Sequence, residues 1–194
     1  MAKTDRRTLY TKGVIKDALL EKLQEKIFTE ITVTEICRTA EINRGTFYIH
    51  YDNLTAVLNE LIDEVFQGSK SLFQHLGLDS NGESASKCSL PFCLHVQKCK
   101  KYKAIFLDDS LTCYTIKRLS NYFKEEFVEN LMAKSALTRK QAEAIFIFQI
   151  NGCFAVNKAV HWNQDTSRNW CPIQGTIDDF IANGIQGFIK KNNN

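Results

Sequence analysis

Residues 32–58 read Thr-Val-Thr-Glu-Ile-Cys-Arg-Thr-Ala-Glu-Ile-Asn-Arg-Gly-Thr-Phe-Tyr-Ile-His-Tyr-Asp-Asn-Leu-Thr-Ala-Val-Leu, and this stretch decides the fold. Its pattern predicts two short helices, a three-residue turn between them, and a third helix. Thr32 and Glu35 have the spacing of a reciprocal capping box, so the first short helix is expected to begin at about Val33. Apolar residues at i, i+3, i+4 and i+7 then form one inward stripe, Val33, Ile36, Cys37 and Ala40.

The second short helix has one inward and one outward face. The turn Glu41–Asn43 interrupts the periodicity, and Asn43 is a good N-cap for the helix that follows. Phe47 and Tyr51 are four residues apart and share the inward face. The outward face carries Gly45, Thr46, Ile49 and His50. A glycine within a helix costs about 1 kcal/mol relative to alanine, and it is usually tolerated where another backbone or a ligand approaches closely. The pattern is that of a helix-turn-helix, whose second helix enters the major groove of DNA.

The run Ile42–Tyr51, preceded by Ile31–Ile36, resembles the signature of TetR/AcrR-type transcriptional regulators. The resemblance covers about residues 8–60 and includes the Gly-Thr-aromatic-Tyr run. It implies an all-α fold of about nine helices. In such a fold a three-helix helix-turn-helix DNA-binding domain, residues 1–53, precedes a helical effector-binding and dimerisation domain, residues 54–194.

Two residues depart from this signature. Glu41 stands at a turn position that usually holds glycine, and it would cost roughly 1 kcal/mol if its φ angle is positive. Leu54 stands where a lysine often meets a phosphate at the start of the following helix. The amide end of that helix is still able to face a phosphate.

The resemblance implies double-stranded DNA as the partner and a homodimer that binds an inverted repeat, with half-sites about one DNA turn apart. Arginine is the usual side chain that recognises guanine, and an apolar side chain suits a thymine methyl group. The candidates for base contacts are therefore Thr34, Arg44, Thr46 and Ile49. The candidates for phosphate contacts, which set the register, are Tyr48 and His50. Thr32, Asn43 and Gly45 complete the predicted DNA-binding set.

The composition agrees with a helical chain that does not enter a membrane. Among 194 residues, 44% are hydrophobic and 24% charged, with only 2 prolines and 9 glycines, and no long stretch alternates in the manner of a strand. No segment reaches about 18 consecutive apolar residues. The first residues lead into an amphipathic helix rather than into a signal-peptide region, so we expect a cytoplasmic protein.

The net charge of +3 is too small to indicate nucleic-acid binding, but its distribution is uneven. Residues 1–16 carry five basic side chains against Asp5, and they are predicted to face phosphates. The alternative is a solvated, frayed chain end. The basic side chains are Lys3, Arg6, Arg7, Lys12 and Lys16. A second basic run, Lys98 to Lys103, is interpreted as an exposed turn or as cations near a helix C-terminus.

No cofactor, metal site or catalytic site is expected. The seven cysteines are odd in number, so a disulfide framework is disfavoured, and the spacing of Cys88, Cys93, His95 and Cys99 fits a zinc site poorly. The cysteines are expected in the core or lining a pocket, although an exposed one could sense oxidants. A Ser-x-x-Lys pattern at residues 84–87 lies in a predicted loop, residues 77–89, without a partner motif. The chain is therefore predicted not to be an enzyme.

Periodic stretches predict the remaining helices. A helix over 9–27, with the ridge Ile15, Leu19, Leu23 and Ile27, supports the helix-turn-helix, and a helix over about 54–73 links it to the rest of the chain. Residues 90–131 are helical and rich in aromatic side chains, which could line a pocket for an organic ligand or form an ordinary core. The resemblance implies a small apolar or aromatic effector, with the candidates Phe92, Val96, Phe106, Cys113, Tyr122, Phe123 and Phe146.

The last two predicted helices span 139–162 and 176–190, the second with Thr176 and Asp179 as an N-terminal cap. Both bear apolar stripes that need partners, and the resemblance assigns them to a four-helix dimer interface. The candidates are Cys153, Val156, Val160, Ile177, Phe180, Ile181, Gly184, Ile185 and Phe188. The alternative is that these helices close the core of one subunit.

The resemblance also implies a mechanism of repression. An effector would favour a state in which the helix over 54–73 tilts, so that the two recognition helices no longer match their half-sites. Two alternatives remain from the sequence. One is a regulator of the same fold that answers to a protein partner or has no effector. The other is a helical enzyme or carrier that happens to contain the motif, against which stands the absence of a catalytic constellation.

Overall fold

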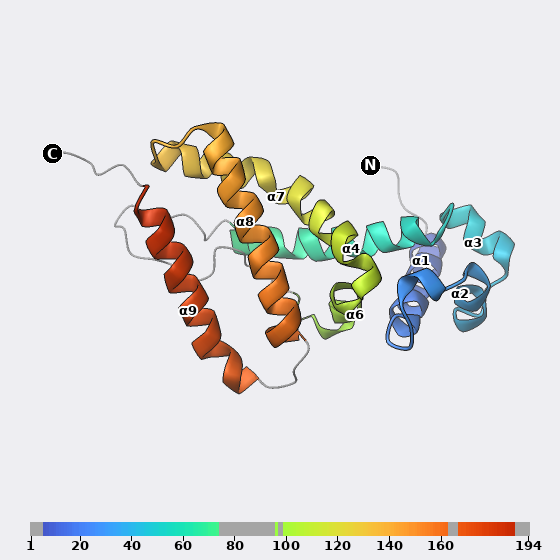
Figure 1. The fold of residues 1–194 in the computed structure, drawn as a ribbon. Coiled ribbons are helices and arrows are strands. Elements are labelled where there is room, and N and C mark those ends of the chain that lie inside the picture. The colour runs from blue at the N-terminus through green and yellow to red at the C-terminus, as the bar shows by residue number, and fades with distance from the viewer. Residues whose placement is uncertain (1–5, 74–95, 97–98, 163–166, 189–194) are drawn as a thin grey trace. The chain divides into compact units, whose positions relative to one another are not determined.

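The computed structural model describes residues 6–73, 96, 99–162 and 167–188, and all regular elements in these ranges are helices (Figure 1). The first part of the chain holds α1 (Arg6–Lys22), the 3₁₀ turn η1 (Phe28–Glu30), α2 (Val33–Thr39), α3 (Arg44–His50) and α4 (Leu54–Phe73). The second part holds η2 (Lys100–Tyr102), α6 (Lys103–Leu107), η3 (Asp109–Leu111), α7 (Thr112–Lys134), α8 (Arg139–Val156), the π-helical η4 (Asn157–Trp162) and α9 (Ser167–Gln186). No described helix is long and apolar enough to cross a bilayer.

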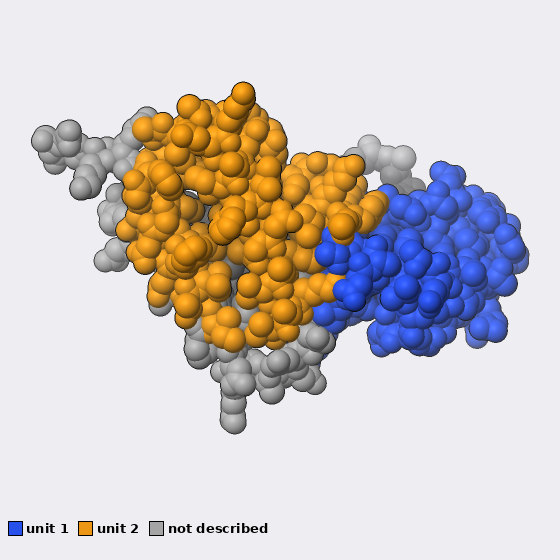
Figure 2. Space-filling model, in the orientation of Figure 1, with its two compact units in different colours: residues 1–68, 99–112 blue, residues 69–98, 113–194 orange. Residues whose placement is uncertain are grey.

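The chain divides into two compact units (Figure 2). Unit 1 comprises residues 1–68 and 99–112, and unit 2 comprises residues 69–98 and 113–194. Residues 99–112 thus belong to the unit that contains the helix-turn-helix. The division of the sequence into domains at residues 53 and 54 remains a prediction.

The helix-turn-helix forms as its local signals predict. Thr32 accepts a hydrogen bond from the backbone N–H of Glu35 and the Glu35 carboxylate accepts one from the N–H of Thr32, which completes the capping box at Val33. Ile36 and Cys37 are buried, and on α3 Phe47 is fully buried. On α4 the residues spaced by three and four are at most 1% exposed, namely Val57, Leu58, Leu61, Ile62, Val65 and Phe66.

The predicted first helix was wrong at both ends. Its core residues Ile15, Leu19 and Leu23 are buried as expected, but α1 spans Arg6–Lys22 and Ile27 is 42% exposed. After Lys22 the N–H groups of Gln24 and Glu25 donate to carbonyls only three residues earlier, those of Glu21 and Lys22, and the N–H of Lys26 closes the turn on Lys22. The chain then reverses so that Ile31 is buried, and this tertiary requirement overrides the good helix propensity of residues 23–27.

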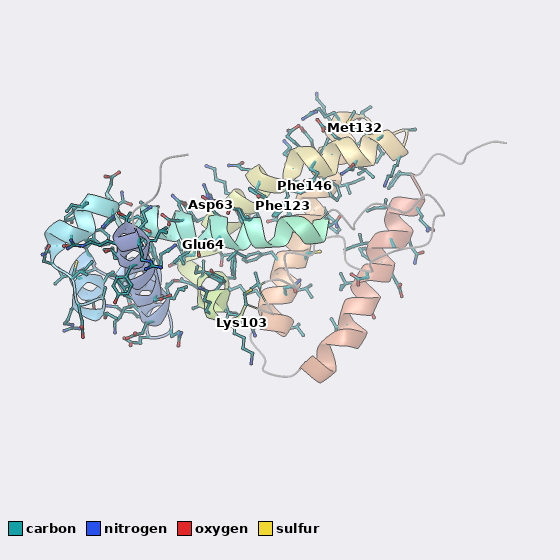
Figure 3. All side chains as sticks on the ribbon, turned by 180° about the vertical axis from the view of Figure 1, so that it is seen from behind. Asp63, Glu64, Lys103, Phe123, Met132 and Phe146 are labelled. Carbon is teal, nitrogen blue, oxygen red and sulfur yellow. The ribbon has the colours of Figure 1, made fainter. Side chains whose placement is uncertain are left out.

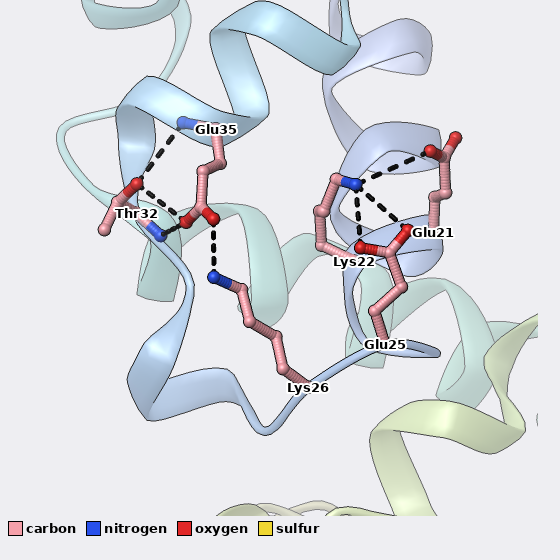
Figure 4. Close-up of polar contacts among 6 residues, drawn as sticks. All are labelled: Glu21, Lys22, Glu25, Lys26, Thr32 and Glu35. Carbon is pink, nitrogen blue, oxygen red and sulfur yellow. Dashed lines mark hydrogen bonds and ion pairs between the residues drawn. The ribbon is translucent and has the colours of Figure 1, made fainter.

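Polar contacts fix the reversal between α1 and α2 (Figure 4). Lys22 pairs with Glu25, and Lys26 donates to Glu35 across the turn. The hydrogen bond from Lys26, together with those from Thr32, lowers the pKa of Glu35 to about 2. The carboxylate therefore serves as both the N3 residue of α2 and the anchor of the preceding turn.

This pKa predicts an acid-dependent loss of stability. Glu35 is ionised in both the folded and unfolded states above its ordinary pKa of 4.5, so its contribution is complete there. Between pH 4.5 and about 2 only the unfolded state takes up the proton, and the contribution fades. Denaturation curves of the wild type and of Glu35→Gln, which keeps an N3 capping side chain, should differ by a constant free energy above pH 5 and converge towards pH 2. A difference independent of pH would contradict this assignment.

Residues 99–112 are anchored in unit 1 by one buried carboxylate and by apolar packing. Asp108 accepts hydrogen bonds from the backbone N–H of Phe28 at 2.6 Å and from that of Ser110 at 2.7 Å. Ile105, Phe106 and Leu111 are buried. The continuous helical stretch predicted over 90–131 is thus broken at Asp108, which caps η3 and joins it to η1. Lys100 and Lys101 lie exposed in η2 and Lys103 begins α6, whereas Lys98 lies outside the described residues.

In unit 2, the long helices α7 and α8 place aromatic residues in the core (Figure 3). Phe123 and Phe146 are almost completely buried, and the Phe146 ring lies 5.3 Å from that of Phe127. Thr138 and Gln141 form a second capping box at the start of α8. The predicted cap at Thr176 and Asp179 was wrong, because α9 begins at Ser167 and already contains both residues.

Candidate DNA-binding site

The face of α3 opposite the core is largely exposed. Phe47 is fully buried and Tyr51, which follows the helix, is 5% exposed, whereas Ile49 is 78% and Tyr48 47% exposed. Arg44 and Gly45 are exposed as well, and Thr46 and His50 are half-buried. The helix thus presents a cation, a phenol and an aliphatic side chain outward. Thr32 and Thr34, at the start of α2, are also exposed.

Asn43 and Gly45 together form the start of α3. The Asn43 side-chain oxygen accepts a hydrogen bond from the backbone N–H of Thr46 at 2.7 Å, so Asn43 is the N-cap that the sequence predicted. A Cβ atom on residue 45 would lie 3.2 Å from that same oxygen. Gly45 therefore leaves room for the Asn43 cap. This role within the chain is separate from the close approach of DNA that the sequence predicts at this glycine.

Arg44 contacts both helices of the motif. Its Nη1 donates to Thr34 Oγ1 at 3.4 Å and its Nη2 donates to the Tyr48 hydroxyl at 3.3 Å. The guanidinium carbon also lies 5.9 Å from the centre of the Tyr48 ring. The structure thus brings two of the predicted DNA-binding residues, Thr34 and Tyr48, into contact with a third, Arg44.

The turn between α2 and α3 closes with a Schellman motif. The N–H of Ile42 donates to the carbonyl of Cys37 at 3.0 Å, and the N–H of Glu41 donates to that of Arg38 at 3.3 Å. This pattern requires a left-handed residue at the position of Glu41, and its φ is 53°. Glu41, which stands where the family signature usually has glycine, therefore does adopt the left-handed conformation.

Replacing Glu41 with glycine is expected to stabilise the protein. Glycine removes a left-handed penalty of about 1 to 2 kcal/mol, and its greater freedom in the unfolded chain offsets about 0.5 to 1 kcal/mol of this gain. The net gain should be about 0.5 to 1 kcal/mol. Urea denaturation should rank the variants Gly first and Asn second, with Ala no better than Glu. Equal stabilities for Gly and Ala would show that the turn is not strained.

An ion-pair cluster lies behind the motif, where α1, α4 and the end of α3 meet. Lys12 and Lys16 bind Glu60 at 2.8 and 3.2 Å, Lys16 also binds Glu64, and the Tyr51 hydroxyl donates to Glu60 at 3.1 Å. Against the effect of burial, hydrogen bonds from the two lysines and Tyr51 lower the pKa of Glu60. Glu64 in turn accepts a hydrogen bond from the Tyr102 hydroxyl of η2. The cluster fixes the end of α3 to α1 and α4.

The sequence interpretation missed this cluster and assigned Lys12 and Lys16 to phosphate. The sequence does contain a signal for the cluster. Lys12 and Lys16 are one helical turn apart, and so are Glu60 and Glu64, so the two basic residues match the spacing of the two acidic ones. Of the other basic side chains in residues 1–16, Arg6 and Arg7 lie exposed at the start of α1, and Lys3 lies outside the described residues. At the start of α4, the Asn53 side chain accepts a hydrogen bond from the N–H of Ala56. Leu54, in the first turn, is half-buried.

The predicted effector residues lie in different surroundings. In unit 2, Phe123 and Phe146 are buried, Tyr122 is half-buried with its ring 4.7 Å from that of Phe123, and Cys113 is exposed. Val96 is buried, but Phe106 belongs to unit 1, and Phe92 lies outside the described residues. These residues remain candidates.

The predicted dimer residues converge on one apolar groove of about 360 Å³ between α8 and α9. Every one of them except Val160, which is half-buried in η4, lines this groove. Phe148 also lines the groove. The side chains of Phe148 and Phe180 are 70% and 64% exposed. The other face of α8 is closed into unit 2 through Phe146, Ile150 and Phe154. The groove side of α8 is only partly covered, since Cys153 is buried while Phe148 is exposed.

No group of three or more histidine, cysteine or acidic side chains is placed to hold a metal ion within the described part of the chain. Cys88, Cys93 and His95 of the disfavoured zinc cluster lie outside it. Cys37 and Cys153 are buried thiols, and Cys113 is an exposed one.

Comparison with known proteins supports this architecture. No protein-family model matches the chain. A Bacillus subtilis (strain 168) protein, the uncharacterized HTH-type transcriptional regulator YxbF, is 32% identical over 60 residues, which are 30% of this chain and 16% of that protein's length. The solved structure of the dihydroxyacetone kinase operon activator DhaS superposes with a TM-score of 0.55 at 16% identity, and the match covers 93% of this chain and 98% of that one. The chain has an all-α, TetR-like fold.

Proposed function

We propose that the protein is a DNA-binding transcriptional regulator of the TetR/AcrR type that acts in the cytoplasm as a homodimer on an inverted-repeat operator. The observation that carries the proposal is the exposed face of α3, where Arg44, Tyr48 and Ile49 point away from a core sealed by Phe47. The motif resemblance, the match to YxbF and the fold shared with DhaS support it. A fully buried anchor beneath an exposed polar and aliphatic face is what a helix needs to enter a major groove without unfolding.

The groove between α8 and α9 supports the homodimer. Exposed apolar surface of this kind favours association, and a two-fold axis would let the same helices from two subunits cover each other. Gly152 and Gly184 line the groove and would allow a close approach of the partner helices. Dimerisation would place two copies of α3 about one turn of DNA apart.

The aromatic core of unit 2 supports a small apolar or aromatic effector. Tyr122 and Phe123 on α7 and Phe146 on α8 would supply apolar and edge-on contacts to such a ligand. Binding there would release a repressor from its operator by favouring a state in which α4 is tilted. The name of DhaS describes an activator, so a reporter gene behind the operator should establish the sign of regulation. A compound that binds unit 2 at saturation without changing operator affinity would refute this part.

Selection of bound sequences from random duplex DNA at moderate salt tests the function. The wild type should enrich an inverted repeat, and Ile49→Asp, which changes only an exposed side chain, should enrich none while keeping its circular dichroism spectrum. A wild-type protein that enriches no sequence would remove specific DNA recognition from the function. Moderate salt is needed because unspecific phosphate binding dominates at low salt.

A further inference from the structure

The guanidinium of Arg44 already has a preferred orientation in the DNA-free protein. One terminal nitrogen donates to Thr34 on α2 and the other to the Tyr48 hydroxyl on α3, at 3.4 and 3.3 Å. Tyr48 is one helical turn after Arg44, so its ring also lies beneath the side chain, 5.9 Å from the guanidinium carbon. The side chain is thus oriented by contacts from both helices of the motif.

The three backbone positions involved are themselves fixed. The Thr32–Glu35 capping box sets the first turn of α2, where Thr34 lies, and the Asn43 cap sets the first turn of α3, which begins at Arg44. The Tyr48 ring packs edge-on against buried Phe47, with centroids 5.4 Å apart and planes at 87°. Tyr48 is therefore a firm support rather than a free surface side chain.

Within the part of the chain that the structure describes, no carboxylate forms an ion pair with Arg44. A guanidinium has five N–H donors, and two neutral hydroxyl contacts leave enough of them for the two acceptors of a guanine edge. Both hydroxyl contacts are long, so they bias the orientation of the side chain without locking it.

We propose that Thr34 and Tyr48 are positioning residues that pre-orient Arg44 for one base pair, and that neither hydroxyl contributes sequence preference of its own. This inference rests on the proposed function and revises the candidate roles of Thr34 as a base contact and Tyr48 as a phosphate contact. An arginine side chain loses much rotational freedom when it binds a base edge. Restricting that freedom in the free protein lowers the cost of binding the correct base.

The test compares binding of variants to the selected operator and to operators changed at each position. Arg44→Ala first identifies the base pair whose preference Arg44 sets. Tyr48→Phe and Thr34→Val each remove one hydroxyl with little change of shape, and Thr34→Ser is the control that keeps the acceptor. We expect Tyr48→Phe and Thr34→Val to lower the preference at that same base pair by roughly three- to tenfold, as expected for one hydrogen bond, while Thr34→Ser and the salt dependence stay unchanged.

Double variants give a second, independent measurement. In the Arg44→Ala background, Tyr48→Phe and Thr34→Val should have no further effect, since both act through the missing guanidinium. In the DNA-free protein, ¹⁵N relaxation of the Arg44 side chain should report less motion than that of exposed Arg38, and Tyr48→Phe should remove the difference. All three residues are exposed, so none of these changes is expected to unfold the protein.

Several results would overturn the inference. A uniform loss across all operators with a weaker salt dependence would make Tyr48 a phosphate contact, and a changed preference at a different base pair would make Thr34 a base contact. Unchanged preference in both variants would show that the orientation of Arg44 is unimportant. A wild-type protein that selects no operator would overturn the proposed function together with this inference.

Discussion

Replacing Phe180 with aspartate is expected to separate the protein into monomers and to abolish tight operator binding. Phe180 lines the α8–α9 groove and is 64% exposed in the isolated chain, so the subunit itself should fold normally. A central aromatic residue contributes at least about 2 kcal/mol to an interface, and an unpaired charge in its place adds a desolvation cost. Because a two-fold interface contains the residue twice, dimer association should weaken by more than about 100-fold.

Sedimentation equilibrium and operator titration measure this effect. Phe180→Leu keeps an apolar side chain and should remain dimeric. Asn183→Asp adds the same charge to an exposed position of α9 outside the groove and should also remain dimeric. A wild type that is monomeric at micromolar concentration, or an aspartate variant that stays dimeric, would show that the groove is not the interface.

Replacing Phe47 with alanine is expected to cost about 3 to 5 kcal/mol of unfolding free energy. Phe47 is fully buried, and its ring lies 5.4 Å from that of Tyr48 and 6.1 Å from that of Tyr51. Its loss would leave a cavity under α3, so α2 and α3 should exchange their amide hydrogens faster and the proposed DNA binding should fail. Urea denaturation and hydrogen exchange measure both consequences.

Ile49→Ala is the matched control for this prediction, because Ile49 is two residues away on the same helix but 78% exposed. Its stability should remain within about 0.5 kcal/mol of the wild type. A loss below about 1 kcal/mol in Phe47→Ala would mean that the helix collapses over the missing ring and that Phe47 is not the anchor of the motif.

The elements predicted well are those with local signals. The capping box at Thr32 and Glu35, the Asn43 cap and the apolar spacing of α4 depend on residues within one or two turns, so the sequence contains the whole interaction. The ends of α1 and α9 were wrong because they depend on the tertiary fold. The chain leaves α1 at Lys22 to bury Ile31, and α9 continues through Pro172 and Gly175, which helix propensity disfavours.

The sequence proposes residues for the candidate site, but it does not give their geometry. Arg44 and Thr34 were identified by type and position, yet their contact depends on the stacking of α2 on α3, and no spacing within either helix encodes it. The same holds for Glu60, which joins Lys12 of α1 to Tyr51 after α3. Contacts between helices become visible only once the helices are placed.

The ion-pair cluster behind α3 bears on how the proposed regulator would search a chromosome. Glu60 and Glu64 act as built-in counterions for Lys12 and Lys16, so these lysines have few mobile salt ions to release when DNA approaches. Release of such ions is the main source of attraction to unmatched sequence. Encounters with the wrong sites would accordingly be brief, and the time spent at a site would depend on the base pairs that α3 contacts.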